Sequence, residues 1–290
     1  MNESTLRLLT MLMAIAIAIT AFADERQDFE KDQFNFTTRP ENDKREPVID
    51  RLLNGEYKTN PQLFEAYKSV LWMYRPSNGD TTRQFSGVLT ESNDTVVTSA
   101  HEIFSDYPEN NILHSNVNEI LAVYTHDLEV NFIKHKVVGV IPYIAPHKSA
   151  RGKDLVVLKI EPFEEIKPRK VRVFTNEELA RMDFYHVAFH GDVSDGEKKM
   201  VQRCEAKLLR DSNPFPEEKS ILPTTCSVFG GSSGGGVFPL ESTDYPLVAL
   251  QRGFYGNRNA GFAYSTVIDQ HAADFIVGAA KSKVLLPPVR

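Results

Sequence analysis

Residues 224–238 read TTCSVFGGSSGGGVF, fifteen positions that hold five glycines and three serines. The apolar pair Val-Phe frames the glycines on each side, at 228–229 and 237–238, whereas a flexible linker is polar on both sides. Glycines allow backbone N–H groups to converge on one point, and in Gly-x-Ser-Gly-Gly the N–H groups of Gly231 and Ser233 are placed to bind an oxyanion. We therefore interpret the run as a tight turn between strands that presents the Ser233 hydroxyl, with a linker as the alternative on this motif alone.

A serine hydroxyl is a weak nucleophile without a base, so further groups are required. His101 ends the apolar stretch DTVVTSAH, whereas the other seven histidines lie in polar, loop-like or strand-interior surroundings. Asp154 opens the apolar stretch DLVVLKI, where a carboxylate is placed to orient a base. In isolation, a capping histidine and a turn aspartate are the commoner interpretations. The motifs follow one another as His, Asp and Ser, 53 and 79 residues apart and each at a predicted strand edge, which favours a catalytic triad.

Short β-rich runs follow one another from about residue 66, separated by turn residues such as SNGD, ESND, GD and GN. They include YKSVLWMY, RQFSGVLT, DTVVTSA, DLVVLKI and PLVALQRGF. Many short strands at this spacing predict an all-β sandwich or barrel rather than βαβ units. An apolar stripe over 267–282 predicts one closing helix, and NEELARM (176–182) predicts a short helical turn.

The N-terminus has the features of a secretory signal peptide. A basic residue precedes the apolar run 8–22, which is short for a membrane span of roughly 20 residues and ends in a small-x-small pattern, Ala-Phe-Ala. We predict a signal peptide over 1–23, with an uncleaved anchor as the alternative. Residues 24–46 carry thirteen charges in twenty-three positions and only three large apolar groups. We therefore predict a disordered extension or prosegment over 24–65.

Charge and cysteine content narrow the classes of function. The net charge of −6 and the pI of about 5.8 give no global electrostatic case for binding nucleic acid. Cys204 and Cys226 are the only cysteines. In an oxidising compartment an even pair most simply forms one disulfide, with two separate buried thiols as the alternative. The sequence has no cluster of metal ligands and no phosphate-binding loop, so we predict no metal site and no cofactor.

Together these motifs resemble the trypsin/chymotrypsin-like serine protease family. SGVLTESNDTVVTSAH resembles the strands that end in the family's Thr-Ala-Ala-His, DLVVLKI resembles its Asp block, and GGSSGGGVF resembles its Gly-Asp-Ser-Gly-Gly block. The following strand, PLVALQRGFYG, also matches the family pattern. The resemblance covers about residues 66–280 and implies two six-stranded antiparallel β-barrels with a C-terminal helix. It implies one all-β protease domain over 66–283.

The resemblance also implies roles for the site residues. His101 is expected to be the general base, Asp154 to hold its tautomer, and Ser233 to be the nucleophile. The N–H groups of Gly231 and Ser233 are expected to form the oxyanion hole. Ser232 replaces the acid that pairs with a new N-terminal amine in zymogen-activated relatives, and Gly236 replaces the usual Pro. With these departures the chain more closely resembles the bacterial V8-like (glutamyl-endopeptidase-like) branch. We do not expect activation by a new N-terminus.

The family pattern places substrate-binding residues just before the nucleophile and on the strand that follows it. The predicted set is Ser227, Val228, Gln251, Arg252 and Gly253. Trypsin-like enzymes have an Asp at the position of Ser227, so basic residues are expected to bind poorly here. Leu250 occupies the position of the pocket histidine of glutamyl-specific relatives. We expect a small or medium apolar residue before the scissile bond, with an acidic residue second.

The resulting hypothesis is an exported serine endopeptidase, secreted or periplasmic. It hydrolyses protein or peptide substrates through an acyl-enzyme intermediate. It implies no nucleic-acid partner and, after signal cleavage, no membrane partner. The alternatives are a catalytically silent binding protein on the same fold and an esterase that uses the same triad. Silent relatives usually lose a triad member, whereas all three are present here.

Overall fold

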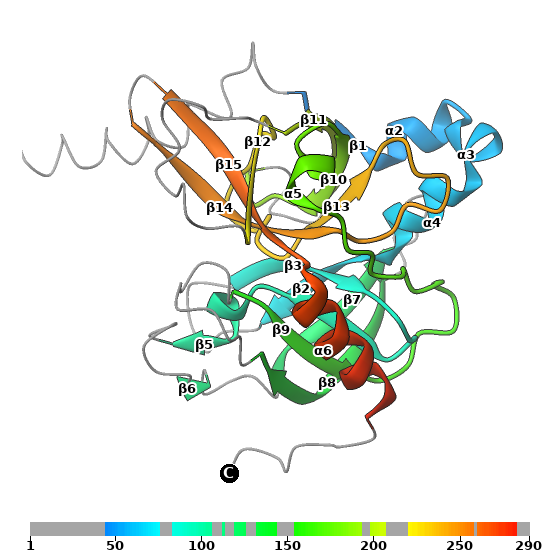
Figure 1. Ribbon diagram of the computed structural model, residues 1–290. Helices are drawn as coiled ribbons and strands as arrows, with labels where there is room; N and C mark the ends of the chain where they lie inside the picture. The colour runs from blue at the N-terminus through cyan, green and yellow to red at the C-terminus, as the bar shows by residue number, and fades with distance from the viewer. Residues whose placement is uncertain are drawn as a thin grey trace, which may run out of the picture.

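The structure, a computed structural model, consists of two β-sheet halves that lie one above the other in Figure 1. It describes residues 44–75, 83–105, 112–113, 119–125, 132–143, 154–192, 198–206, 220–257 and 260–282. The predicted signal peptide (1–23) and the first part of the predicted extension (24–43) lie outside the described residues. Among the helices of the described ranges, none is long and apolar enough to cross a membrane.

The first half is a closed barrel of six antiparallel strands. These are β2 (Val70–Arg75), β3 (Arg83–Leu89), β4 (Thr95–Thr98), β7 (Leu121–Thr125), β8 (Phe132–Pro142) and β9 (Val156–Ile160). They pair in the order β2-β3-β4-β9-β8-β7, and β7 pairs back with β2. Leu71, Phe85 and Leu158 belong to the buried apolar cluster of this barrel, since alternate side chains of a strand point to one face. A small hairpin, β5 (Phe104–Ser105) and β6 (Ile112–Leu113), lies beside it (Figure 1).

The second half is a sheet in the order β1-β11-β10-β13-β14-β15-β12. Its strands are β1 (Glu46–Pro47), β10 (Asp183–Phe189), β11 (Lys199–Glu205), β12 (Ile221–Thr224), β13 (Gly236–Pro239), β14 (Ala249–Asn257) and β15 (Ala260–Val267). A bridge between Ala206 and Thr224 and a disulfide between Cys204 and Cys226 join β11 to β12. Strands β10 to β15 therefore form a second barrel, to which β1 adds. The predicted pair of six-stranded antiparallel barrels is confirmed.

The segment before the first barrel is ordered. After β1 the chain forms α2 (Val48–Leu53), α3 (Glu56–Thr59) and α4 (Pro61–Ser69). The Asn60 side chain caps α4 by accepting a hydrogen bond from Leu63 N–H at 3.2 Å, and Val48, Leu63 and Tyr67 are buried. The prediction of disorder was therefore wrong for residues 46–65, and the folded unit begins near 46 instead of 66. The high charge density of the preceding residues does not continue here, where apolar side chains recur at a helical spacing.

The predicted helices are present as α5 (Asn176–Leu179) and α6 (Gln270–Lys281). The Asp269 side chain caps α6 by accepting a hydrogen bond from Ala272 N–H at 2.8 Å. Although α6 follows the second barrel in sequence, it lies against the first, beside β8 and β9 in Figure 1. Lys159 on β9 donates to the Ala280 carbonyl at 3.5 Å. The C-terminal helix thus connects the two halves.

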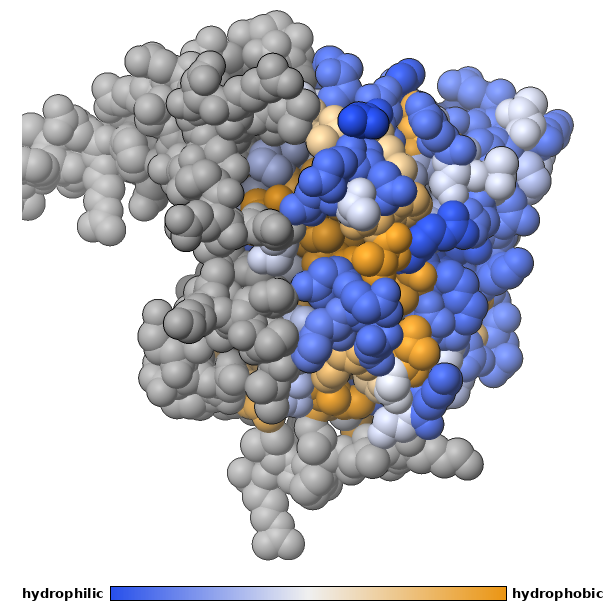
Figure 2. Space-filling view, in the orientation of Figure 1, coloured by the Kyte–Doolittle hydropathy of each residue, from blue (hydrophilic) through white to orange (hydrophobic). Residues whose placement is uncertain are grey.

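A shared apolar core holds the halves together. It combines side chains of both barrels with side chains of the N-terminal helices and α6, among them Trp72, Val157, Val187, Phe238, Leu63 and Ile276. In Figure 2 apolar side chains gather in a band across the middle of the coloured surface, and most of the other coloured side chains are hydrophilic. This packing fixes the strand ends of one barrel against those of the other, where the candidate site lies.

Candidate active site

His101 and Asp154 come from the first barrel. His101 lies in the 3₁₀ turn η1 (Ala100–Glu102), which follows β4, and Asp154 precedes β9, which pairs with β4. His101 Nδ1 lies 2.7 Å from Asp154 Oδ2, and the His101 backbone N–H donates to Oδ1 at 2.9 Å. Asp154 is fully buried. Both carboxylate oxygens are therefore held by one residue, which fixes the imidazole ring relative to the carboxylate.

Ser233 comes from the loop between β12 and β13 of the second barrel. Its Oγ lies 3.1 Å from His101 Nε2. Ser86 on β3 reaches this loop from the first barrel, because its N–H donates to the Ser233 carbonyl at 2.8 Å and its Oγ to the Gly231 carbonyl at 2.9 Å. The structure thus brings the predicted His, Asp and Ser side chains into one hydrogen-bonded series.

Two glycines of this loop have backbone conformations that other residues rarely adopt. Gly231 has a φ of 92° and Gly234 a φ of 79°. A Cβ at Gly234 would lie 2.1 Å from the Ser86 carbonyl oxygen. The Gly234 N–H donates to the carbonyl of Gln251 on β14 at 2.7 Å. The glycine run is therefore a tight turn, as predicted, and not a linker.

Hydrogen bonds to two carbonyl groups of the turn orient the N–H groups of the same peptide units. The Gly230 carbonyl accepts from Gly191 N–H at 2.6 Å, and the Ser232 carbonyl accepts from a glycine N–H of the turn at 2.9 Å. Because C=O and N–H point to opposite sides of a trans peptide, the N–H groups of Gly231 and Ser233 point away from these partners. Among the described residues neither N–H donates to a protein acceptor. Such a pair of N–H groups is suited to an oxyanion.

Charged groups around the imidazole shift its pKa upward. Burial lowers the pKa of His101, but the carboxylates of Asp154 and Glu102 outweigh burial and raise the pKa to about 10. Glu102 lies on the same turn, with Oε1 3.2 Å from His101 Nε2. Burial raises the pKa of Asp154, but His101 and Arg252 together bring it below its ordinary value. Asp154 is therefore ionised, and the imidazole lies between two carboxylates.

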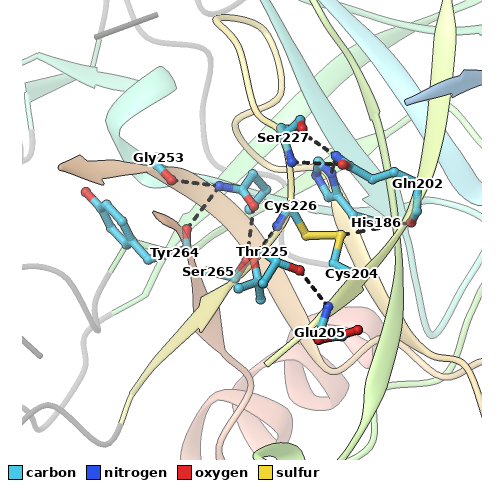
Figure 3. Close-up of a disulfide and its surroundings, with 12 residues drawn as sticks. His186, Gln202, Cys204, Glu205, Thr225, Cys226, Ser227, Gly253, Tyr264 and Ser265 are labelled. Carbon is cyan, nitrogen blue, oxygen red and sulfur yellow. Dashed lines mark hydrogen bonds between the residues drawn. A yellow bond between two sulfur atoms is a disulfide. The ribbon is translucent and has the colours of Figure 1, made fainter. Parts of the chain in front are cut away.

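The predicted disulfide between Cys204 and Cys226 is present and closes the second barrel (Figure 3). Two of the predicted substrate-binding residues, Ser227 and Val228, follow it directly and are buried. The Ser227 N–H donates to Gln202 Oε1 at 2.8 Å. The segment that leads to the glycine turn is therefore attached to β11 by a covalent bond and by several hydrogen bonds.

The other predicted substrate-binding residues lie on β14. Gln251 Nε2 donates to the carbonyls of Gly253 and Tyr264 at 2.9 and 3.1 Å, so its side chain is held within the sheet. Arg252 extends toward His101 and Asp154, where its Nε donates to Asp154 Oδ2 at 2.7 Å. Its guanidinium also lies over the Tyr264 ring, 5.6 Å from the centroid. Strand β14 thus contributes an ion pair to the site.

Sequence reasoning missed three contacts of this site. Ser86 was not singled out, although a Ser-Gly pair interrupting the apolar strand RQFSGVL was a signal for it. Glu102 was not considered either, although it adjoins His101. Arg252 was assigned to substrate binding, and its partner Asp154 lies 98 residues away in sequence. No local pattern indicates such a pairing.

Two β-barrels that bring a buried aspartate, a histidine and a serine into one hydrogen-bonded series define the class of protein, a trypsin-like hydrolase. The sequence model of the trypsin-like peptidase domain matches residues 85–244, more than half of the chain. The chain belongs to this family, as its motifs predicted. No curated protein matches the sequence.

Solved structures of serine proteases share the fold at low sequence identity. A Glu endopeptidase solved with MPD has a TM-score of 0.55 and 15% identity, over 83% of this chain and 98% of that one. The protease Anisep from Arthrobacter nicotinovorans has a TM-score of 0.57 and 14% identity, over 75% and 98%. The thermostable serine protease AL20 from an extremophilic microorganism has a TM-score of 0.56 and 13% identity, over 76% and 100%. At these identities the likeness establishes the fold alone.

Proposed function

We propose that the protein is an exported serine endopeptidase in which His101, Asp154 and Ser233 act as a catalytic triad. The observation that carries the proposal is the series from Asp154 Oδ2 through the imidazole to Ser233 Oγ, at 2.7 and 3.1 Å. His101 takes the Ser233 proton as Oγ attacks the peptide carbonyl, and it gives this proton to the leaving amine as the acyl-enzyme forms. A water molecule, deprotonated by the same imidazole, then hydrolyses the acyl-enzyme.

The N–H groups of Gly231 and Ser233 receive the negative charge of the tetrahedral intermediate. Support comes from the hydrogen bonds that fix the neighbouring carbonyls, including the bond from Ser86 Oγ to the Gly231 carbonyl. Donors held in place before the reaction need no reorganisation as the charge develops. Loss of one such donor raises the activation free energy by roughly 3 kcal/mol.

We further propose a preference for a small or medium apolar residue before the scissile bond. The support is the buried Val228 beside Ser227 and the absence of an acid at Ser227. An acidic substrate side chain would have to compete with Asp154 for Arg252, so it ranks second. Profiling with a peptide library tests this preference. Dominant cleavage after Lys or Arg contradicts it.

We place the activity outside the cytoplasm, in the periplasm or beyond the cell. The disulfide supports this location, since such bonds persist in oxidising compartments. The substrates are then proteins or peptides of that compartment. The N-terminal sequence of the mature protein tests export, and we expect it to begin after Ala23 or further along the chain.

Labelling by a fluorophosphonate probe tests the proposed nucleophile. We expect the labelled peptide to carry the probe on Ser233. Ser233→Ala should abolish labelling, and Ser232→Ala, its neighbour in the same turn, should keep it. A protein that labels and cleaves esters but no peptides would be an esterase. A protein that neither labels nor hydrolyses would be a silent binding protein.

A further inference from the structure

Arg252 contacts two members of the proposed triad. Its Nε donates to Asp154 Oδ2 at 2.7 Å, and the same oxygen lies 2.7 Å from His101 Nδ1. Its backbone carbonyl lies 3.4 Å from Ser233 Oγ. The Arg252 side chain is 14% exposed and that of Asp154 is 0% exposed, so solvent screens this ion pair weakly.

The charge balance of the site therefore depends on Arg252. While His101 is neutral, Asp154 and Arg252 form a pair with no net charge. A proton added to His101 gives the three side chains one net positive charge. Without Arg252, the same proton would leave His101 and Asp154 with no net charge. Because two positive charges repel each other and solvent screens them weakly here, Arg252 opposes protonation of His101.

Glu102 acts in the opposite direction. Its Oε1 lies 3.2 Å from His101 Nε2, the nitrogen that faces Ser233. Among the described residues, the charged groups that contact the imidazole or its carboxylate partner are Asp154 and Glu102 from the first barrel and Arg252 from the second. Arg75 donates to the Glu102 backbone carbonyl at 3.3 Å, not to its carboxylate. Two carboxylates thus favour the protonated imidazole and one guanidinium disfavours it.

We propose that Arg252 is a positioning residue that holds Asp154 in place and, by offsetting the two carboxylates beside His101, limits how strongly they favour the protonated imidazole. The inference rests on the proposed function, because only a base that returns to its neutral form needs this balance. When His101 carries the proton during acylation, the oxyanion supplies a compensating negative charge. Arg252 therefore disfavours protonation most strongly in the free enzyme.

The direct test is the titration of the His101 imidazole by NMR in the whole folded protein. A Glu102→Gln background brings the midpoint down from the alkaline range. Adding Arg252→Met to this background should raise the midpoint by about one to two pH units. Adding Arg252→Lys, which keeps the positive charge, should raise it by less. An unchanged or lowered midpoint with folded Arg252→Met overturns the proposal.

Control variants separate the charge effect from a general disturbance. Arg172→Met removes an exposed arginine that pairs with Asp244, and we expect no change of the midpoint. If Arg252→Met does not fold, Arg252→Gln provides a neutral side chain that still donates to Asp154, with the same upward shift expected. A shift of equal size in Arg172→Met would overturn the assignment to Arg252.

Activity gives a second measurement. The acid limb of kcat/KM should move to higher pH in Arg252→Met and to lower pH in Glu102→Gln. A purely structural role would lower the rate at every pH and leave the limb in place, and this result would overturn the proposal. If the wild-type protein hydrolyses no peptide, the proposed function fails. The NMR midpoints still decide the role of Arg252 in that case.

Discussion

His101 in the first half and the pair His186 and His190 in the second half differ in the charges that surround them. Burial lowers the pKa of all three imidazoles. At His101 the carboxylates of Asp154 and Glu102 reverse this effect and raise the pKa to about 10. One histidine is therefore held ready to carry a proton.

At His186 and His190 the neighbouring charge is a cation. Arg45, whose guanidinium binds Asp192 at 2.7 and 2.8 Å, adds to the effect of burial. The pKa of His186 falls to about 3, and that of His190 falls well below its ordinary value. Both rings stay neutral, and Gln202 Nε2 lies 3.1 Å from His186 Nδ1 (Figure 3). Burial acts in the same direction on all three imidazoles, so the sign of the neighbouring charge explains why the pKa of His101 is high and those of His186 and His190 are low.

The largest expected difference between the two regions is in activity. His101→Ala should lower kcat by about 10⁴-fold or more, because the nucleophile loses its base. His186→Gln removes no group from the reaction, so we expect less than about a tenfold loss, acting through stability. Steady-state hydrolysis of a peptide substrate measures both. Similar losses of kcat in the two variants would contradict the expected difference between His101 and His186.

The pH dependence of activity should follow His101 alone. Only the neutral imidazole accepts the Ser233 proton, and the pKa of His101 is about 10. We therefore expect kcat/KM to rise about tenfold per pH unit above pH 7 and to level off near that pKa. Initial rates in buffers of constant ionic strength measure this limb. A midpoint below pH 7 would show that the carboxylates do not control the imidazole.

The disulfide belongs to the second region, and its removal should affect stability more than chemistry. Cys204 and Cys226 are 22 residues apart, and opening a loop of this size costs about 3 kcal/mol in the chain-entropy model. Cys204→Ala/Cys226→Ala should lose about this free energy of unfolding in urea, while keeping fluorophosphonate labelling of Ser233 at low temperature. Unchanged stability would contradict the closing role of the bond.

A pH dependence of stability is also expected, with opposite signs in the two regions. Below about pH 6.5 His186 and His190 become protonated in the unfolded chain but not in the folded chain. Each histidine therefore lowers the free energy of unfolding by about 1.4 kcal/mol for every unit by which the pH decreases. His101 contributes stability that is present below its unfolded pKa and is lost as pH rises toward about 10. Urea unfolding from pH 4 to 10 measures both limbs.

The control for this prediction is His186→Gln, which should remove one histidine's share of the acid limb and leave the alkaline limb in place. His101→Gln should do the reverse. If both variants keep the wild-type dependence of unfolding free energy on pH, other titrating groups determine it, and the expected difference between the two regions is contradicted.

The fold and the meeting of His101, Asp154 and Ser233 at the candidate site could be predicted because the signals for them are local in sequence. His101 and Asp154 adjoin apolar strand patterns, and the turn around Ser233 needs glycine at positions with positive φ. The ion pair between Arg252 and Asp154 could not be predicted, because a long side chain can reach several partners and only the tertiary structure shows which one lies beside it. The order of residues 46–65 was missed for a related reason: short helices are stabilised by packing more than by their own composition.

The first and the last described elements each pack on the half that they do not adjoin in sequence. Strand β1 precedes the first barrel but pairs with the second, where Glu46 lies opposite Val201, and α6 follows the second barrel but packs on the first. Contacts so distant in sequence form slowly during folding. During synthesis, the contacts of β1 with β11 and of α6 with the first barrel can therefore form only after the strands of the second barrel have been made. His101 belongs to the first barrel and Ser233 to the second, so an incompletely synthesised chain has no assembled candidate site.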